Sequence, residues 1–286
     1  MTINKELVRK NFSRHAFEYD LYAKIQKVMA NKLLQLIQHN TSKPYPKILE
    51  IGCGTGNLTK LLLEHYPNAK YTVFDLSESM IQQTKRKIGG MQKNIDFFAV
   101  DAERILNRDR TKKASEAFDN IFEQTYDLII SNATFQWFNT PEQTIEAYMN
   151  SLNTNGVFAF TTFGPDTFYE LHTSFYEVEK QLNLAHQQHG QKFMSMNEWR
   201  QVFKQQMNEI CIVEEKIAEQ YESVREFMHH VKRVGAGNAN KHDSSQADIG
   251  INRRLILNME KYYAKHFATA QGVQATYHLC YGVYEK

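Results

Sequence analysis

The chain has 286 residues, of which 42% are hydrophobic and 12% are aromatic, so it can form a folded core and is not disordered throughout. Its formal net charge of +2 is too small to point to nucleic acid as the main partner. No signal-peptide pattern, no apolar run of roughly 18 residues and no metal-site or disulfide spacing of the cysteines is found, so we expect a cytoplasmic protein without membrane contact or metal.

Residues 5–38 are predicted to be helical, because Ile25, Met29 and Leu33 recur at helical spacing within them. A breaker-rich linker at residues 41–46 separates this N-terminal part from an alternation of strands and helices. The alternation predicts a doubly wound, mostly parallel α/β sheet. Its first five strands are expected at residues 47–51, 71–74, 95–100, 126–131 and 156–163.

Two of the helices between these strands carry start signals. Ser77 is the expected N-cap of the helix after the second strand. Thr140 is expected to cap the helix after the fourth strand, with Pro141 at its first position. Residues 103–125, between the third and fourth strands, are charged and irregular, and we predict a surface helix or loop there.

The last third of the chain departs from the alternation. Capping-box patterns at residues 195–198 and 223–226 predict two helix starts, and Gly235 is expected to end the second of these helices. The remaining elements are a strand, a helix and a final strand, at residues 210–220, 253–267 and 276–284. We therefore expect a sheet of seven strands and a chain of four parts. These are an N-terminal helical cap at residues 1–45, the core at 46–220, a helical lid at 221–272 and the last strand of the core at 273–286.

A candidate cofactor site follows the first strand, which runs into Gly52, Gly54 and Gly56 and then into a helix. Glycine permits a sharp turn and the close approach of a ligand, and the helix N-terminus presents free N–H groups. Asp75 ends the second strand about 20 residues further on, where a carboxylate can accept hydrogen bonds from a ribose diol. These features predict an adenosine-type cofactor, and by themselves they fit both NAD and S-adenosylmethionine.

The surroundings of the glycines favour S-adenosylmethionine. The spacing Gly-x-Gly-x-Gly differs from the dinucleotide pattern Gly-x-Gly-x-x-Gly, and residues 50–57 resemble the first motif of class I methyltransferases, whose fold is Rossmann-like. That resemblance implies that Glu50 helps to hold the amino end of the cofactor, that Asp101 and Ala102 contact adenine and that the backbone of Asn132 faces the methionine part. The expected cofactor residues are Tyr22, Glu50, Gly52, Gly54, Gly56, Asp75, Leu76, Met80, Asp101, Ala102 and Asn132.

Motifs that distinguish one methyltransferase family from another lie elsewhere along the chain. They read FSRHAFEYD at 12–20, SNATFQW at 131–137, FTTFG at 160–164, KRVGA at 232–236 and TYHLCYG at 276–282. Over nearly the whole chain these motifs are similar to those of the malonyl-acyl carrier protein O-methyltransferases of biotin synthesis. The resemblance implies transfer of a methyl group from S-adenosylmethionine to the free carboxylate of a malonyl thioester on acyl carrier protein, or on coenzyme A, with S-adenosylhomocysteine as the second product.

The reaction itself limits which residues are needed. A carboxylate is already ionised at neutral pH, so positioning and exclusion of water matter more than a general base. Aromatic side chains of the N-terminal segment, among them Phe17, Tyr19 and Tyr22, are candidates for covering the reaction centre and excluding water from it. We expect three residues at the reaction centre, Tyr19, Gln136 and Trp137, and four cationic candidates for substrate or partner contact, Arg14, His15, Lys232 and Arg233.

The charge of the proposed lid bears on the partner. Between Arg225 and Lys265, eight Lys or Arg stand against four Asp or Glu, so this part is more basic than the whole chain. A basic surface suits an acidic partner such as acyl carrier protein.

Two alternatives stay open from the sequence. One is a small-molecule carboxyl methyltransferase of the trans-aconitate type, which shares the Asn-Ala-x-x-Gln-Trp kind of motif after the fourth strand. The other is a non-catalytic protein that binds S-adenosylmethionine. A nucleic-acid methyltransferase is disfavoured, because no Asn/Asp-Pro-Pro-Tyr motif follows the fourth strand and the charge is near neutral.

Overall fold

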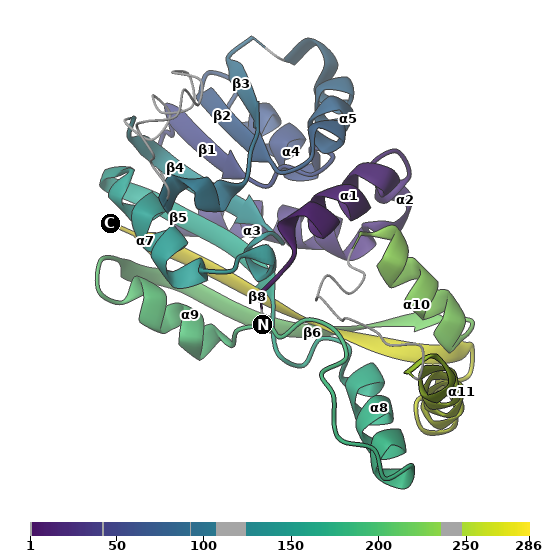
Figure 1. Cartoon of the computed structure of the whole chain (residues 1–286). Helices are drawn as coiled ribbons and strands as arrows, with labels where there is room; N and C mark the ends of the chain where they lie inside the picture. Colours follow the sequence, from purple (N-terminus) through teal and green to yellow (C-terminus); the bar gives the residue numbers. More distant parts are fainter. Residues whose placement is uncertain (1, 42, 92, 107–123, 236–247) are drawn as a thin grey trace.

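An eight-stranded sheet forms the centre of the computed structural model, which describes residues 2–41, 43–91, 93–106, 124–235 and 248–286 (Figure 1). Its strands are β1 Lys47–Ile51, β2 Lys70–Asp75, β3 Ile95–Ala99, β4 Tyr126–Asn132, β5 Leu152–Phe163, β6 Asn208–Tyr221, β7 Ala268–Thr269 and β8 Gly272–Glu285. They follow the order β3-β2-β1-β4-β5-β8-β6, and the short β7 pairs with β8. Strands β1 to β5 are parallel, whereas β8 is antiparallel to both β5 and β6. The predicted mostly parallel sheet is confirmed, and β7 is an addition to the seven strands expected.

Helices pack on both faces of this sheet, because side chains alternate along the central strands. Ile48, Leu128 and Val157 belong to one core, which is completed by α3 Lys24–Asn40, α4 Asn57–His65 and α5 Glu78–Ile88. The neighbouring residues on the same strands, Leu49, Ile129 and Phe158, belong to a second core. That core is completed by α7 Pro141–Asn150, α9 Met196–Phe203 and two 3-10 turns, η2 Ala102–Leu106 and η3 Phe135–Trp137. A further 3-10 turn, η1 Gly89–Met91, follows α5.

The N-terminal part is three helices, where the sequence predicts continuous helix. They are α1 Lys5–His15, α2 Tyr19–Tyr22 and α3. The breaks fall at two small buried residues, Ala16 and Ala23, which let the chain turn against the sheet. They also bring Asp20 to the glycine loop, where its carboxylate accepts hydrogen bonds from Thr55 Oγ1 at 2.7 Å and from Asn57 Nδ2 at 3.1 Å and pairs with Lys87 Nζ at 2.7 Å.

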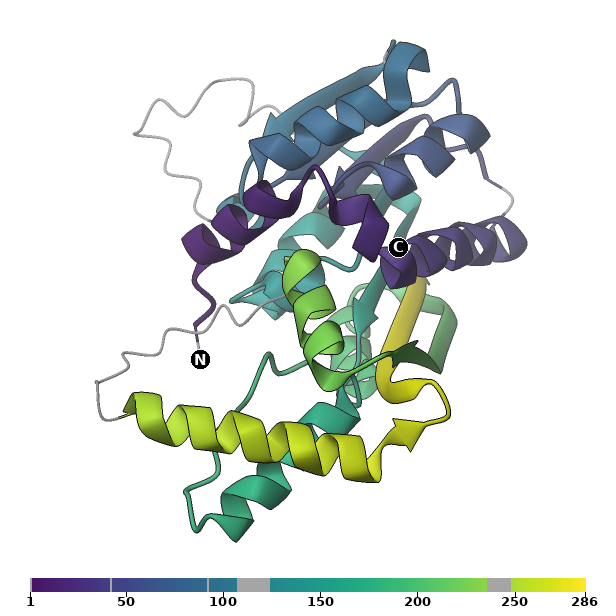
Figure 2. The same cartoon turned by 90° about the vertical axis from the view of Figure 1, so that its right-hand side faces the viewer.

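Three helices gather at one end of the long β6–β8 pair (Figure 1). They are α8 Tyr169–Gln181, which the sequence analysis does not predict, α10 Val224–Arg233 and α11 Asp248–His266. Their apolar side chains form a third core that includes Phe175, Phe227 and Tyr263. Figure 2 shows α10 beside the N-terminal helices, with α11 farther from them. Among the described helices, none combines the length and the apolar character needed to cross a bilayer.

All four predicted helix starts are confirmed, and three of them have the predicted side-chain cap. Ser77 Oγ accepts from the Met80 N–H, Ser195 forms a complete capping box with Glu198, and Ser223 Oγ accepts from the Glu226 N–H. Gly235 adopts a φ of +71° just after α10, as a helix stop requires. The neighbouring residues 236–247 and most of the predicted irregular segment, residues 107–123, lie outside the described part of the chain.

The capping role predicted for Thr140 is wrong. Its hydroxyl does not cap α7 but donates to Glu103 Oε1 at 2.9 Å. Glu103 also accepts from the backbone N–H groups of Asn139 at 2.9 Å and Thr140 at 2.6 Å. A carboxylate from a distant turn therefore serves the start of α7, where negative charge is favoured by the helix dipole.

Glu170 fastens α8 to the sheet. The residue is fully buried, and its carboxylate accepts from the Thr276 backbone N–H at 2.9 Å, from Thr276 Oγ1 at 2.6 Å and from Gln274 Nε2 at 3.1 Å. Loss of this acceptor leaves buried donors of β8 without partners, which is more costly than loss of an exposed contact.

We expect Glu170→Ala to lower the free energy of unfolding by about 2–4 kcal/mol, because three hydrogen bonds to a buried carboxylate are lost. Urea unfolding followed by circular dichroism measures the change. Glu177→Ala on the same helix, at a partly exposed position, is the matched control. Equal unfolding midpoints for the two variants would contradict the role given to Glu170.

Candidate functional site

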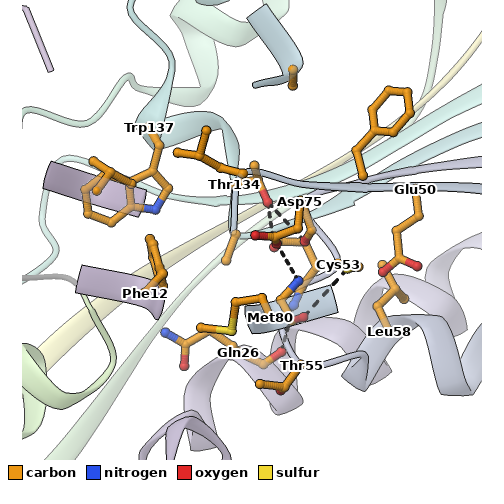
Figure 3. A pocket seen from close by; sticks show the side chains of 18 of the residues that line it. Phe12, Gln26, Glu50, Cys53, Thr55, Leu58, Asp75, Met80, Thr134 and Trp137 are labelled. Atoms are coloured by element: carbon orange, nitrogen blue, oxygen red, sulfur yellow. Dashed lines mark hydrogen bonds between the residues drawn. The ribbon is translucent and has the colours of Figure 1, made fainter. Parts of the chain in front are cut away.

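A pocket lies at the carboxyl ends of β1 to β4, beneath the N-terminal helices (Figure 3). We call it the strand-end pocket. Its walls come from the glycine loop after β1, from the residues after β2, β3 and β4, and from α1, α2 and α3. The structure brings together here nine of the eleven predicted cofactor residues, Glu50, Gly52, Gly54, Asp75, Leu76, Met80, Asp101, Ala102 and Asn132.

Asp75 organises the loop around this pocket. Its Oδ2 accepts from the Gly54 N–H at 2.8 Å and its Oδ1 from the Ser77 N–H at 2.8 Å. Burial raises the pKa of Asp75 to about 6, against the lowering effect of these two backbone bonds. Each carboxylate oxygen can accept a second hydrogen bond. The residue is therefore fixed by the backbone and still able to bind a diol.

Glu50 is an acid with an unused oxygen. The residue is 1% exposed, and its Oε2 has no hydrogen-bond partner among the described atoms. Burial raises the pKa of Glu50 to about 8, and the nearby charge of Asp75 acts in the same direction. A buried, unpaired carboxyl group is costly unless a ligand satisfies it. A ligand with a positively charged amino group fits this requirement.

The glycine loop needs glycine for two different reasons. Gly52 has a φ of +76°, and a Cβ there would lie 2.1 Å from Thr134 Oγ1, so no side chain can be accommodated. Gly56 has a φ of +83°, and its Cβ would lie 2.7 Å from Thr84 Cγ2. Gly56 does not line the strand-end pocket, so its contribution is the close packing of α4 against α5.

Tyr22 also lies outside the strand-end pocket, in contrast to the prediction. Its ring packs edge-on against His230, with 5.4 Å between ring centroids. The contact joins α2 to α10. Tyr22 therefore links the N-terminal segment to the helical insertion. Phe17, another candidate for the cover, is 85% exposed and covers neither pocket.

A second, larger cavity of about 520 Å³ adjoins the first, and we call it the outer pocket. It lies between the N-terminal helices, α8, α10 and the ends of β5 and β8. Much of its wall is apolar, and Phe163, Phe168, Leu171, Phe175, Phe227 and Tyr277 contribute to it. Helix α8, which the sequence analysis missed, therefore supplies part of this wall.

Five described residues line both pockets, Phe12, Tyr19, Gln26, Ala133 and Trp137. We call their meeting point the junction. Trp137 and Phe12 pack edge-to-face there, with ring centroids 5.5 Å apart (Figure 3). Tyr19 and Trp137 were predicted at the reaction centre.

Gln136, the third residue predicted at the reaction centre, lines the outer pocket but not the strand-end pocket. Its amide is engaged, since Nε2 donates to the Ala133 carbonyl at 2.6 Å and Oε1 accepts from Thr162 Oγ1 at 3.3 Å. Gln26 was not predicted, because in the sequence it is one polar residue on a helix with many. Its position follows from the hydrogen bond of Asn132 Nδ2 to the Gln26 carbonyl at 3.0 Å.

The four predicted cationic residues separate into two groups. Arg14, His15 and Lys232 line the outer pocket, whereas Arg233 forms an ion pair with Glu18 outside it. His15 Nδ1 lies 3.1 Å from the same Glu18 carboxylate. Within the described part of the chain, Arg14 and Lys232 have no ion-pair partner, so their charges are available to a ligand.

One combination of metal-ligating types, Glu214, His278 and Cys280, lies on β6 and β8 away from both pockets. His278 Nε2 is 3.0 Å from Glu214 Oε2, and its Nδ1 is 3.5 Å from the Asp166 backbone N–H. Both ring nitrogens are thus engaged by protein groups. The arrangement is explained by hydrogen bonding without an ion.

Comparison with known proteins defines the class first. Residues 49–158 match the model of a methyltransferase domain. The fold is similar to a solved structure of a putative methyltransferase from Bacillus halodurans, with a TM-score of 0.56, 13% identity and coverage of 90% of this chain and 99% of that one. It is also similar to the YcgJ protein of Bacillus subtilis, with a TM-score of 0.52, 13% identity and coverage of 90% and 98%. The chain therefore contains a methyltransferase domain and has the Rossmann-like fold of class I methyltransferases.

Curated relatives define the family. The chain is 37% identical to the malonyl-[acyl-carrier protein] O-methyltransferase of Bacillus anthracis, over 96% of this chain and 95% of that one. It is 34% identical to the protein of the same name from Halalkalibacterium halodurans, over 98% of each chain. A third, from Acetivibrio thermocellus, is 37% identical over 96% of this chain and 92% of that one. The chain belongs to the malonyl-[acyl-carrier protein] O-methyltransferase family.

We expect Asp75→Ala to weaken binding of S-adenosylmethionine at least about 10-fold, because the predicted acceptor for the ribose diol is removed. Isothermal titration calorimetry measures the dissociation constant. Asp96→Ala, at an exposed position on β3, is the matched control. Unchanged affinity in the Asp75 variant would refute its cofactor role.

The raised pKa of Glu50 predicts a pH-dependent stability of the cofactor-free protein. The folded state keeps the Glu50 proton up to about pH 8, whereas a model carboxyl group loses it near 4.5. Between these values the folded state binds more protons than the unfolded chain, so rising pH lowers the free energy of unfolding. We expect Glu50→Gln to make the free energy of unfolding fall less steeply with rising pH. The substitution should therefore benefit stability more at pH 8 than at pH 5. Parallel pH profiles of the urea midpoint for both proteins would contradict this.

Proposed function

We propose that this protein transfers the methyl group of S-adenosylmethionine to the free carboxylate of a malonyl thioester carried on acyl carrier protein. The observation that carries the proposal is the junction, where a pocket suited to an adenosyl cofactor meets a separate apolar cavity. The names of the curated relatives support the choice of substrate. The product ester masks the malonyl charge, so that fatty-acid enzymes can extend the chain toward pimeloyl groups and biotin.

The strand-end pocket suits the cofactor because its carboxylates have acceptor oxygens that can take further hydrogen bonds. We infer that Asp75 binds the ribose diol, that Glu50 Oε2 receives the amino end, and that Asp101 and Ala102 flank the adenine. When bound, the cofactor supplies a methyl group on a sulfonium, which is electrophilic without a metal. Lys5 stays engaged beside this site, at 3.2 Å from Asp101 and 2.6 Å from Glu103.

Catalysis depends on orienting the substrate carboxylate and not on a base that would deprotonate it. A malonyl carboxylate is ionised at neutral pH and is a poor nucleophile because water solvates it strongly. Phe12, Trp137 and the apolar wall of the outer pocket exclude water from its approach to the junction. We infer that α8 and α10, whose side chains line the outer pocket, act as the lid over this approach.

The carrier protein docks, in this proposal, at the mouth of the outer pocket. Arg14 and Lys232 lie there, have no ion-pair partner among the described residues, and suit an acidic partner. Arg225, by contrast, is 3.1 Å from Glu260, and Arg233 pairs with Glu18, so part of the predicted positive charge is neutralised within the protein.

The central test compares acceptors for the wild-type protein. We expect methyl transfer to malonyl-acyl carrier protein, measured with radiolabelled S-adenosylmethionine, to exceed transfer to free malonate or aconitate. Preference for a free acid would support the trans-aconitate type instead. Cofactor binding without turnover on any malonyl thioester would indicate a non-catalytic binding protein.

The docking role makes a prediction about Lys232. We expect Lys232→Glu to lower kcat/KM for malonyl-acyl carrier protein about 10-fold, with a smaller effect on malonyl-pantetheine, because charge reversal disfavours an acidic partner. Lys204→Glu, an exposed lysine at the end of α9, is the matched control. Equal losses on both substrates would count against docking.

A further inference from the structure

The five residues of the junction are all uncharged, although charged side chains line the pockets on either side of it. Resting on the proposed function, we propose that the substrate carboxylate is held at the junction by three neutral hydrogen-bond donors, Gln26 Nε2, Trp137 Nε1 and Tyr19 Oη, and not by a cation. Gln26 is thereby assigned as a substrate-binding residue.

Each of the three donors is free to serve a ligand. Among the described contacts, the Gln26 amide, the Trp137 indole N–H and the Tyr19 hydroxyl have no hydrogen-bond partner. All three residues line both pockets, and Figure 3 shows Gln26 and Trp137 within one site. Burial, and then the negative charges of Asp75 and Asp20, raise the pKa of Tyr19, so its hydroxyl stays protonated and can donate. A carboxylate with two oxygens can accept all three bonds.

The cations of the site are placed elsewhere. Lys5 lines the strand-end pocket and is already paired with Asp101 and Glu103. Arg14 and Lys232 line the outer pocket and are exposed to solvent. In the described part of the chain, no cationic residue lines both pockets. The amide of Gln136 is engaged by Ala133 and Thr162, so it does not replace Gln26.

Electrostatics explains why neutral donors suit this reaction. The carboxylate oxygen forms a bond to the methyl carbon while the carbon–sulfur bond breaks and its electron pair stays on sulfur, and no proton moves. A negative and a positive charge are thus both consumed. A cation beside the carboxylate would stabilise the charged reactants more than the less charged transition state and would raise the barrier. Neutral donors orient the same group with less of this penalty.

The three neutral donors, which we call the carboxylate clamp, also release the ester product more readily than the carboxylate substrate. Methylation removes the negative charge, and hydrogen bonds to a neutral ester are weaker than those to a carboxylate. The same three donors therefore distinguish substrate from product.

Gln26→Met and Gln26→Lys test the assignment, with Gln35→Met, at an exposed position of α3, as the matched control. Calorimetry measures binding of S-adenosylmethionine to each variant, and binding of malonyl-pantetheine to each protein loaded with S-adenosylhomocysteine. We expect Gln26→Met to bind malonyl-pantetheine about 10-fold more weakly, because a hydrogen bond to a charged group is lost, with little change in cofactor affinity. We expect Gln26→Lys to bind it more tightly than Gln26→Met does, yet to have a lower kcat than the wild type.

The outcomes separate the clamp from the proposed function. Wild-type turnover on malonyl-pantetheine with unchanged binding in Gln26→Met would overturn the clamp and leave the function intact. An equal loss of cofactor affinity would assign Gln26 to the cofactor instead. A Gln26→Lys variant as fast as the wild type would overturn the electrostatic argument. Failure of the wild type to methylate any malonyl thioester would overturn both proposals.

Discussion

The carboxylate of Asp20 accepts hydrogen bonds from Thr55 and Asn57 and pairs with Lys87, and the geometry of both pockets depends on this contact. Thr55 and Asn57 flank the start of α4, where the helix dipole favours a negative charge. Because Asp20 lies between Tyr19 and the turn into α3, the same contact sets the positions of Tyr19 and Gln26. The N-terminal segment is therefore held on the glycine loop by one partly buried cluster of polar groups.

Charge is distributed along the path from cofactor to solvent in a definite order. Acidic groups, Glu50 and Asp75, lie in the strand-end pocket, where a cationic ligand is expected. Uncharged residues form the junction, and two exposed cations, Arg14 and Lys232, line the outer pocket. This order follows from the chemistry of two oppositely charged reactants that meet and lose their charges. Each end of the path attracts the reactant of opposite sign, while the centre places no charged side chain beside either.

The sheet could be predicted from the sequence because its strands, turns and caps are local patterns. β1, the glycine loop and the Ser77 cap depend on neighbours within a few residues. Helix α8 was missed because its stability comes from distant partners, such as the contact of Glu170 with Thr276. The Thr140 cap was wrong for the same reason, since Glu103 competes for its hydroxyl. In the site, strand-end residues were predictable from their order along the chain. The placement of Gln26 and Tyr22 depends instead on how α2 and α3 pack, and that of Gln136 on its hydrogen bonds to Ala133 and Thr162.

The edge-on contact of Tyr22 with His230 has a consequence for access to the site. It joins α2, whose Tyr19 forms part of the wall between the two pockets, to α10, which lines the outer pocket. Any movement of the N-terminal segment that admits or releases the cofactor therefore also disturbs the substrate cavity. If the two pockets hold the cofactor and the substrate as proposed, we expect exchange of one ligand to depend on occupancy by the other.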